Sequence, residues 1–170
     1  MTEFHAISPE EIGNAFDSIG KDWMLITVKD EENKRVNAMT ASWGAMGVLW
    51  NRKVCICFVR PQRHTCKLLR EQSLFSIGFL GEEHREAHKI LGRKSGADLD
   101  KLSACGLESE EIDGVPVIRE AERVLICKRL YEDDIRENSF LAPELLANYT
   151  AGDYHRFYIC EIVGAYRKGE

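Results

Sequence analysis

The sequence predicts a mainly β fold: an antiparallel barrel with helices at its periphery. At least five segments have the alternating pattern of strands, and they do not alternate with helices in a regular βαβ order. The helical patterns cluster instead in insertions between strands. No G-x-G-x-x-G follows a first strand, which disfavours a parallel dinucleotide-binding sheet. The 170 residues fit a single domain, residues 1–170.

The first element expected is a helix over residues 8–20. Ser8 and Glu11 have the spacing of a capping box, and Pro9 suits the first helical position. The apolar stripe of this helix consists of Ile12, Phe16 and Ile19.

The strand pattern follows the helix and continues to the end of the chain. Strands are expected over residues 22–30, 35–42, 53–60, 73–80, 115–120, 122–132 and 154–168. Further helical segments are expected over residues 63–72, 81–107 and 142–149. A charged turn joins the first two strands, which predicts a hairpin, and the turn Gly-Arg-Lys-Ser-Gly at 92–96 interrupts the long helical segment.

The composition excludes several classes of protein. Hydrophobic residues make up 44% of the chain and charged residues 30%, which predicts a packed core rather than disorder. The net charge of −5 argues against a nucleic-acid-binding protein, although a local site can still be positive. The first residues have neither the basic nor the apolar region of a secretory leader, and no apolar run reaches membrane-spanning length. We therefore expect a cytoplasmic protein without membrane contact.

The cysteines have no metal-binding spacing. They stand at positions 55, 57, 66, 105, 127 and 160. None forms a C-x-x-C pair. We expect reduced thiols that fill the core.

Three short segments have the chemistry of an anion site. Residues 37–43 place two hydroxyls, Thr40 and Ser42, two positions apart beside a turn of small residues, which suits a phosphate or oxyanion. In residues 59–65, Arg63 and Thr65 stand at a helix N-terminus. Residues 92–96 place two cations and a hydroxyl between glycines. Taken singly, each segment has a structural alternative: a hairpin end bonded to its own backbone, a solvated cap, or a surface turn.

Histidines offer two further candidates. His84 and His88 stand four apart, as metal ligands on a helix do, but the glutamate of H-E-x-x-H is absent and no third ligand is evident. We therefore expect a solvated helix face and no metal. His155 leads the last strand, and is either a site residue or a polar residue at the start of a strand.

Together these segments resemble the flavin reductase-like family of FMN-binding split-barrel proteins, and within it the flavoredoxin-like branch. The resemblance covers nearly the whole chain. It is carried, in order, by "NAMTASWGAMGVLW", "CFVRPQRHT", "FSIGFL", "LGRKSGADLDKLSACGL" and "GDYHRFYICEIVGAY". The combination of N-x-M-T-A-S-W with R-P-x-R-x-T is the specific part.

The resemblance implies a six-stranded antiparallel split barrel that dimerises, with one non-covalently bound FMN per subunit near the interface. The segment along the flavin and its phosphate chain would be Met39, Thr40, Ala41, Ser42 and Trp43. The phosphate end would be gathered by Arg60, Arg63, His64 and Thr65. Lys94 and Ser95 would add to it from the helical insertion. Met46, Leu49 and Trp50 would belong to the interface or the core.

The implied activity is that of an FMN-dependent oxidoreductase with NAD(P)H as electron donor. His155 would lie on the substrate or nicotinamide side. Gly152-Asp153-Tyr154-His155 departs from the compact Gly-Asp-His of reductases that serve monooxygenases, which disfavours free-flavin reduction for such a partner. Two alternatives stay open: an electron carrier of the flavoredoxin type without NAD(P)H turnover, and a non-catalytic flavin-binding module.

Overall fold

The computed structural model describes residues 3–169 and is dominated by strands. Its strands are β1 (Phe4–Ala6), β2 (Met24–Asp30), β3 (Arg35–Ala41), β4 (Gly44–Leu49), β5 (Arg52–Val59), β6 (Leu74–Leu80), β7 (Ser109–Ile112), β8 (Val115–Ile118), β9 (Ala121–Asp134) and β10 (Arg156–Lys168). Its α-helices are α1 (Ala15–Asp17), α2 (His64–Glu71), α3 (Ala87–Arg93) and α4 (Lys101–Cys105). The other helical turns are η1 (Pro9–Ile12), η2 (Ser18–Asp22), η3 (Glu82–His84), η4 (Glu137–Ser139) and η5 (Pro143–Tyr149).

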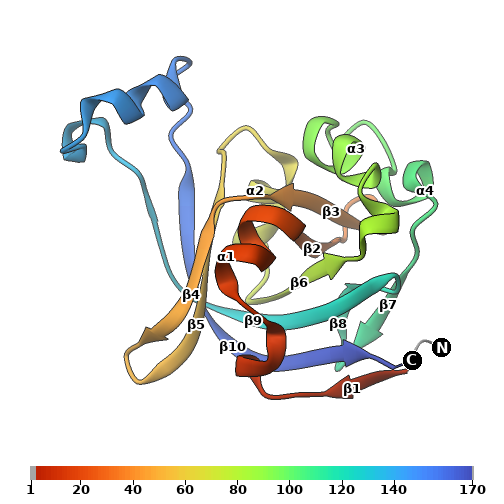
Figure 1. Cartoon of the computed structure of the whole chain (residues 1–170). Helices are drawn as coiled ribbons and strands as arrows, with labels where there is room; N and C mark the ends of the chain where they lie inside the picture. Colours follow the sequence, from red (N-terminus) through yellow and green to blue (C-terminus); the bar gives the residue numbers. More distant parts are fainter. Residues whose placement is uncertain (1–2, 170) are drawn as a thin grey trace.

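The main sheet curls into a barrel. Its order is β3-β2-β6-β9-β10-β5-β4, every neighbouring pair is antiparallel, and β1 adds beside β10. The two ends of this order, β3 and β4, are joined in the chain by only Ser42 and Trp43. Because so short a link cannot cross a flat sheet, the sheet must bend round until its ends meet (Figure 1). The predicted antiparallel barrel with peripheral helices is confirmed.

The number of strands differs from the six expected, because the main sheet contains eight. Two strands of this sheet were missed by sequence reasoning: β1, which is only three residues long, and β4, whose residues GAMGVL show no clear alternation. Gly44 is required there, because a Cβ at this position would lie 2.6 Å from the carbonyl oxygen of Ile56 on β5. Glycine therefore fits here because the start of β4 packs so closely on β5.

The helix expected over residues 8–20 is broken into η1, α1 and η2. Gly13 interrupts it with a φ of 110°, a conformation that side chains rarely adopt. Ile12 and Ile19 are buried as predicted, but Phe16 is 88% exposed and does not belong to their stripe. The capping box of Ser8 and Glu11 is present.

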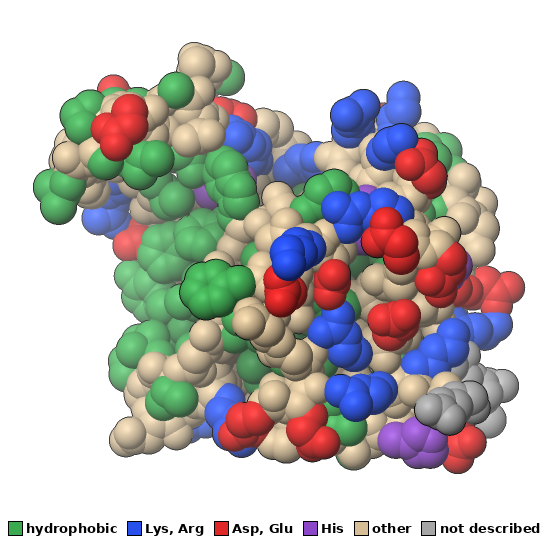
Figure 2. Space-filling view, viewed as in Figure 1, with side chains coloured by type: hydrophobic (Ala, Val, Ile, Leu, Met, Phe, Trp, Pro, Cys, Tyr) green, Lys and Arg blue, Asp and Glu red, His purple; other side chains and the backbone are tan. Residues whose placement is uncertain are grey.

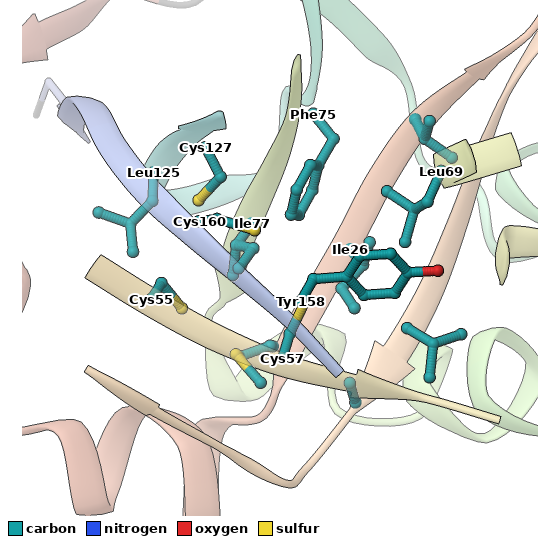
Figure 3. Close-up of a cluster of buried hydrophobic side chains, with 14 of the residues drawn as sticks. Ile26, Cys55, Cys57, Leu69, Phe75, Ile77, Leu125, Cys127, Tyr158 and Cys160 are labelled. Atoms are coloured by element: carbon teal, nitrogen blue, oxygen red, sulfur yellow. The ribbon is translucent and has the colours of Figure 1, made fainter. Parts of the chain in front are cut away.

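Two cores lie on the two faces of the sheet. The barrel interior contains the thiols of Cys55, Cys57, Cys127 and Cys160 together with Tyr158 (Figure 3). The second core lies between the sheet and the segment that carries α3 and α4, and includes Leu25, Leu91 and Leu102. The six cysteines are free, and all but the half-buried Cys105 are buried, so the prediction of reduced core thiols is confirmed. Within residues 3–169, no helix is long and apolar enough to cross a bilayer.

An arm projects from the barrel between β9 and β10. This arm, residues 135–155, contains η4 and η5 and stands apart at the upper left of Figure 1. The ring of Tyr149 stacks on that of Tyr154 with centroids 4.8 Å apart, and both rings contact Phe140. The base of the arm, which ends at His155, returns to the barrel where β3 passes into β4.

Candidate functional site

A cavity of about 220 Å³ opens where β3 ends and the arm returns to the barrel. We call it the strand-end cavity. It is lined by Met39, Thr40, Ala41, Ser42, Trp43, Phe58, Arg60, Arg63 and His155. The structure thus brings the predicted 39–43 segment together with two of the predicted arginines and with His155.

A second cavity, of about 80 Å³, adjoins the first. We call it the cationic cavity. It is lined by Gln62, Arg63, His64, Thr65, Arg93, Lys94, Ser95, Gly96 and Lys101. Because Arg63 lines both cavities, the two are neighbours. Every residue that the sequence suggested for the site lines at least one of the two.

Four cations line the cationic cavity without an ion-pair partner in the described part of the chain. The guanidinium of Arg63 donates to the carbonyl oxygens of Leu91 and Gly92 at the end of α3, and the Lys101 ammonium donates to that of Leu91 at 3.3 Å. Among residues 3–169, no carboxylate forms an ion pair with Arg63, Arg93, Lys94 or Lys101. Burial, and then the charge of Arg63, lower the pKa of Lys101 to about 8. Cations without ion-pair partners, of which Lys101 is buried, favour an anion such as a phosphate.

Buried hydrogen bonds hold the wall of the cationic cavity in place. The Asn37 amide on β3 donates to the Thr65 hydroxyl at the start of α2, at 2.8 Å. Gly96 packs directly on Asn37, because a Cβ on Gly96 would overlap Oδ1 of that side chain. His64 Nε2 lies 2.9 Å from the buried carboxylate of Asp30. These contacts tie β3, α2 and the 92–96 turn into one unit.

The arm supplies the opposite wall of the strand-end cavity. Arg60 pairs with the Asp153 carboxylate at 2.5 Å and donates to the carbonyl oxygen of Asn148. The Tyr149 hydroxyl lies 2.9 Å from Nδ1 of His155. Burial, and then the charge of Arg60, lower the pKa of His155 to about 4. His155 is therefore neutral at pH 7.

Aromatic rings cover one side of the strand-end cavity. The half-exposed ring of Trp43 lies 5.2 Å from that of His155, and the edge of Phe58 meets His155 at 6.4 Å. The backbone N–H groups of Ser42 and Trp43, between β3 and β4, make no backbone hydrogen bond within residues 3–169. An aromatic surface beside free N–H donors suits a flat, polar-edged ring system.

Sequence reasoning missed several residues of the two cavities. Phe58 could have been predicted from the sequence, because it stands two positions before Arg60 and extended chain places such residues on the same side. Arg93 lies inside the 92–96 motif, next to Lys94. The neighbours of Lys101 in the sequence do not indicate that it belongs to the site, because the charged segment around it is typical of a solvated helix. Only packing against Leu91 brings it to the site.

The expectation for His88 is wrong. It was expected on a solvated helix face, but its side chain is buried and its Nδ1 lies 2.7 Å from the Thr40 hydroxyl. His84, in contrast, is partly exposed. Within residues 3–169, no three His, Cys, Asp or Glu side chains are placed to hold a metal ion.

The fold and the two cavities define a class of protein. The family model described as "Flavin reductase like domain" matches residues 16–170, and the chain belongs to this family. A curated relative from Aeropyrum pernix, described as an uncharacterized protein, is 26% identical over 132 residues, which are 76% of this chain and 50% of that protein. The chain thus spans about half the length of the curated relative it matches.

Solved structures share the fold. The FMN-binding domain of a flavin reductases-like enzyme from Shewanella baltica is 19% identical, with a TM-score of 0.68, covering 98% of this chain and 78% of that chain. Flavoredoxin from Desulfovibrio vulgaris (Miyazaki F) is 19% identical, with a TM-score of 0.67, covering 87% of this chain and 69% of that chain. The resemblance inferred from the sequence is therefore confirmed, and with it the split-barrel fold.

Proposed function

We propose that this protein binds FMN non-covalently and acts as an oxidoreductase through it, with NAD(P)H as electron donor. The observation that carries the proposal is the pairing of the two cavities: one with an aromatic wall and free N–H groups, the other with unpaired cations. FMN has the same two ends, a flat ring system and a phosphate with about two negative charges at pH 7. The family's description as flavin reductase-like supports reduction of the flavin, and NAD(P)H as its donor is the further part of the proposal.

The residues present fit the cofactor. Arg63, Lys94 and Lys101 would hold the phosphate in the cationic cavity, where Thr65 and Ser95 add hydroxyls. Backbone N–H groups at Ser42 and Trp43 would bond the polar edge of the ring system in the strand-end cavity. Bound FMN supplies hydride and electron transfer chemistry, while the protein binds it, orients it and tunes its surroundings.

His155 would present a neutral N–H to the reaction side of the strand-end cavity. Its Nδ1 is taken by Tyr149, so Nε2 is the nitrogen left for a substrate or nicotinamide amide. A neutral imidazole orients such a group without adding charge to the cavity.

We also propose that the protein is a homodimer. Apolar side chains stand exposed on the β4–β5 hairpin, where Val48 is 75% and Trp50 is 55% exposed, and at Leu141 on the arm. Figure 2 shows hydrophobic side chains spread over the left face, below the arm and beside β4. A continuous apolar surface of this kind is typical of a protein interface.

One spectrum tests the cofactor assignment. Purified protein, or protein incubated with FMN and passed over a desalting column, is expected to show the visible absorbance of bound flavin. Anaerobic NADH or NADPH is then expected to bleach it. Protein that keeps no flavin contradicts the whole proposal. Flavin that dithionite bleaches but neither nucleotide does contradicts the donor and leaves the electron-carrier alternative.

A further inference from the structure

His88 is the buried polar side chain that the proposed function does not use. It stands on α3, is only 4% exposed, and its Nδ1 lies 2.7 Å from the Thr40 hydroxyl. Thr40 in turn lines the strand-end cavity. The other ring nitrogen, Nε2, is buried and has no hydrogen-bond partner within the described residues. A buried ring nitrogen without a hydrogen-bond partner costs free energy, so its presence in the fold needs an explanation.

The imidazole ring of His88 is fixed in place. Trp23 meets it edge-on, with centroids 5.5 Å apart and an interplanar angle of 88°. The guanidinium of Arg85 lies 4.0 Å above the Trp23 ring and holds it there. On the other side, Gly92 lies against Thr40, because a Cβ built on that glycine would be 3.6 Å from the threonine Cβ, an ordinary contact.

We propose that His88 is a positioning residue that donates a hydrogen bond from Nδ1 to the Thr40 hydroxyl, so that this hydroxyl must donate its own hydrogen into the strand-end cavity. The proposal rests on the proposed function, since the recipient would be an acceptor oxygen or nitrogen of FMN. Thr40 thereby becomes a fixed donor, which favours a ligand that presents an acceptor there and disfavours one that presents an N–H or O–H.

Two observations favour this direction of the hydrogen bond. With the proton on Nδ1, the unpartnered Nε2 is a lone pair, and a buried acceptor without a partner is more common than a buried N–H without one. Arg85, whose positive charge acts on the ring, also favours a lone pair over an N–H on the free nitrogen. Within residues 3–169, the Thr40 hydroxyl has no other side-chain or backbone partner, so its hydrogen is free for the ligand.

The protonation state of His88 agrees with a single N–H. Burial, and then the charge of Arg85, lower its pKa to about 4, so the ring is neutral at pH 7. The opposite tautomer would direct Nε2–H toward a small cavity of about 120 Å³, which Asp22, Glu82 and Glu122 line. A water there would make that tautomer possible, so the two arrangements are distinguished by experiment.

Nitrogen-15 NMR of the full chain without flavin decides the tautomer. The proton of His88 is expected on Nδ1 at pH 7, with Nε2 at the chemical shift of an unprotonated nitrogen. His88→Asn identifies the resonance. A proton on Nε2 overturns the proposal. This measurement is independent of the proposed function, because it needs no cofactor.

Affinity for FMN tests the consequence. His88→Leu is expected to weaken FMN binding about tenfold, the loss of one hydrogen bond to a charged or polar group. His88→Asn keeps an amide near the position of Nδ1 and is expected to stay within about twofold of wild type. His84→Leu, on the same segment but partly exposed, is the matched control and is expected to have no effect.

A double-mutant cycle separates positioning from packing. Thr40→Val is expected to weaken FMN binding about tenfold, and the double variant with His88→Leu to be no weaker than Thr40→Val alone. Additive losses, or a His88→Asn variant as weak as His88→Leu, overturn the proposal. Failure of the proposed function has a different signature, because the wild-type protein itself would then bind no FMN.

Discussion

The Tyr149 hydroxyl lies 2.9 Å from Nδ1 of His155, and both side chains are buried. Burial raises the pKa of Tyr149, so the phenol keeps its hydrogen and donates it to the imidazole. The proton of neutral His155 is thereby placed on Nε2. This nitrogen has no partner within residues 3–169 and is not sealed from solvent. Tyr149, on the arm, thus determines that His155 presents its Nε2–H to the strand-end cavity.

Burial, and then the charge of Arg60, keep His155 neutral, so removing that charge is expected to raise the histidine's pKa. Arg60→Gln takes away a positive charge and leaves the Asp153 carboxylate, which favours the imidazolium. We expect the pKa to move from about 4 toward the ordinary value of about 6.5. Proton NMR titration of His155 measures the change.

Arg52→Gln is the control for this variant. Arg52 pairs with Glu161 on the barrel surface, and its loss is expected to leave the titration of His155 unchanged. An Arg60→Gln variant that still titrates near pH 4 would show that burial alone sets this pKa.

Lys101 is expected to make FMN binding depend on pH above neutrality. Its pKa of about 8 means that the ammonium loses its proton as the pH rises through 8. A phosphate bound beside it favours the charged form, so binding above pH 8 must take up a proton. We expect the dissociation constant to rise by up to about tenfold per pH unit there. Below about pH 6 the phosphate itself becomes a monoanion, which also weakens binding.

Lys101→Met removes this titration. The variant is expected to bind FMN at least about tenfold more weakly at pH 7 and to lose the dependence between pH 7.5 and 9.5. Fluorescence quenching of FMN gives both values. Lys89→Met, which removes an exposed lysine paired with Glu86, is the control. Equal pH dependence in the Lys101→Met variant and wild type rules out this lysine as the titrating group.

Gly96 is expected to tolerate no side chain. A Cβ there would overlap the Asn37 amide, which is buried and donates to Thr65. Gly96→Ala is expected to lower the free energy of unfolding by about 1–3 kcal/mol, since a displaced Asn37 loses its partner. Urea unfolding measures this, and weaker FMN binding should accompany it.

Gly20→Ala is the matched substitution. No atom lies within 4 Å of a Cβ built at Gly20, so we expect no destabilisation. If both alanine variants unfold at the same urea concentration as wild type, then β3 and the 92–96 turn adapt to each other and the wall of the cationic cavity is not rigid.

The sequence revealed the parts of the site that are continuous in the chain. Residues 39–43 and 63–65 form motifs in which every residue lines a cavity, because a strand end and a helix start present neighbouring residues to one place. Individually each motif had a structural alternative. Their order and spacing indicated the family, and the structure brings residues 39–43, 63–65 and 92–96 to two cavities that share Arg63.

The parts that the sequence did not reveal depend on contacts between distant elements. Lys101 and His88 are polar residues in a charged helical segment, and nothing local distinguishes them from solvated neighbours. They are buried because α3 and α4 pack on the β3 side of the sheet. Similarly, β4 could not be recognised from its own alternation and is defined by its pairing with β5. Phe16 shows the reverse case: it matches a helical stripe, but Gly13 breaks the helix and leaves it exposed.

Trp50 tests the proposed dimer. It stands exposed at the tip of the β4–β5 hairpin, and its ring meets that of Tyr131 on β9 at 6.4 Å. A glutamate on such a surface must be desolvated on association, so Trp50→Glu is expected to weaken a dimer by at least about tenfold. Light scattering at several protein concentrations gives the mass, with dimer expected for wild type and monomer for the variant.

Leu74→Glu is the control for the dimer experiment. Leu74 is also exposed, at 37%, but begins β6, which is separated from β5 by β9 and β10 in the sheet. It is expected to leave the mass unchanged. A wild-type protein that scatters as a monomer at all concentrations, with FMN bound, would show that the exposed face of β4 and the arm is not an interface between two copies.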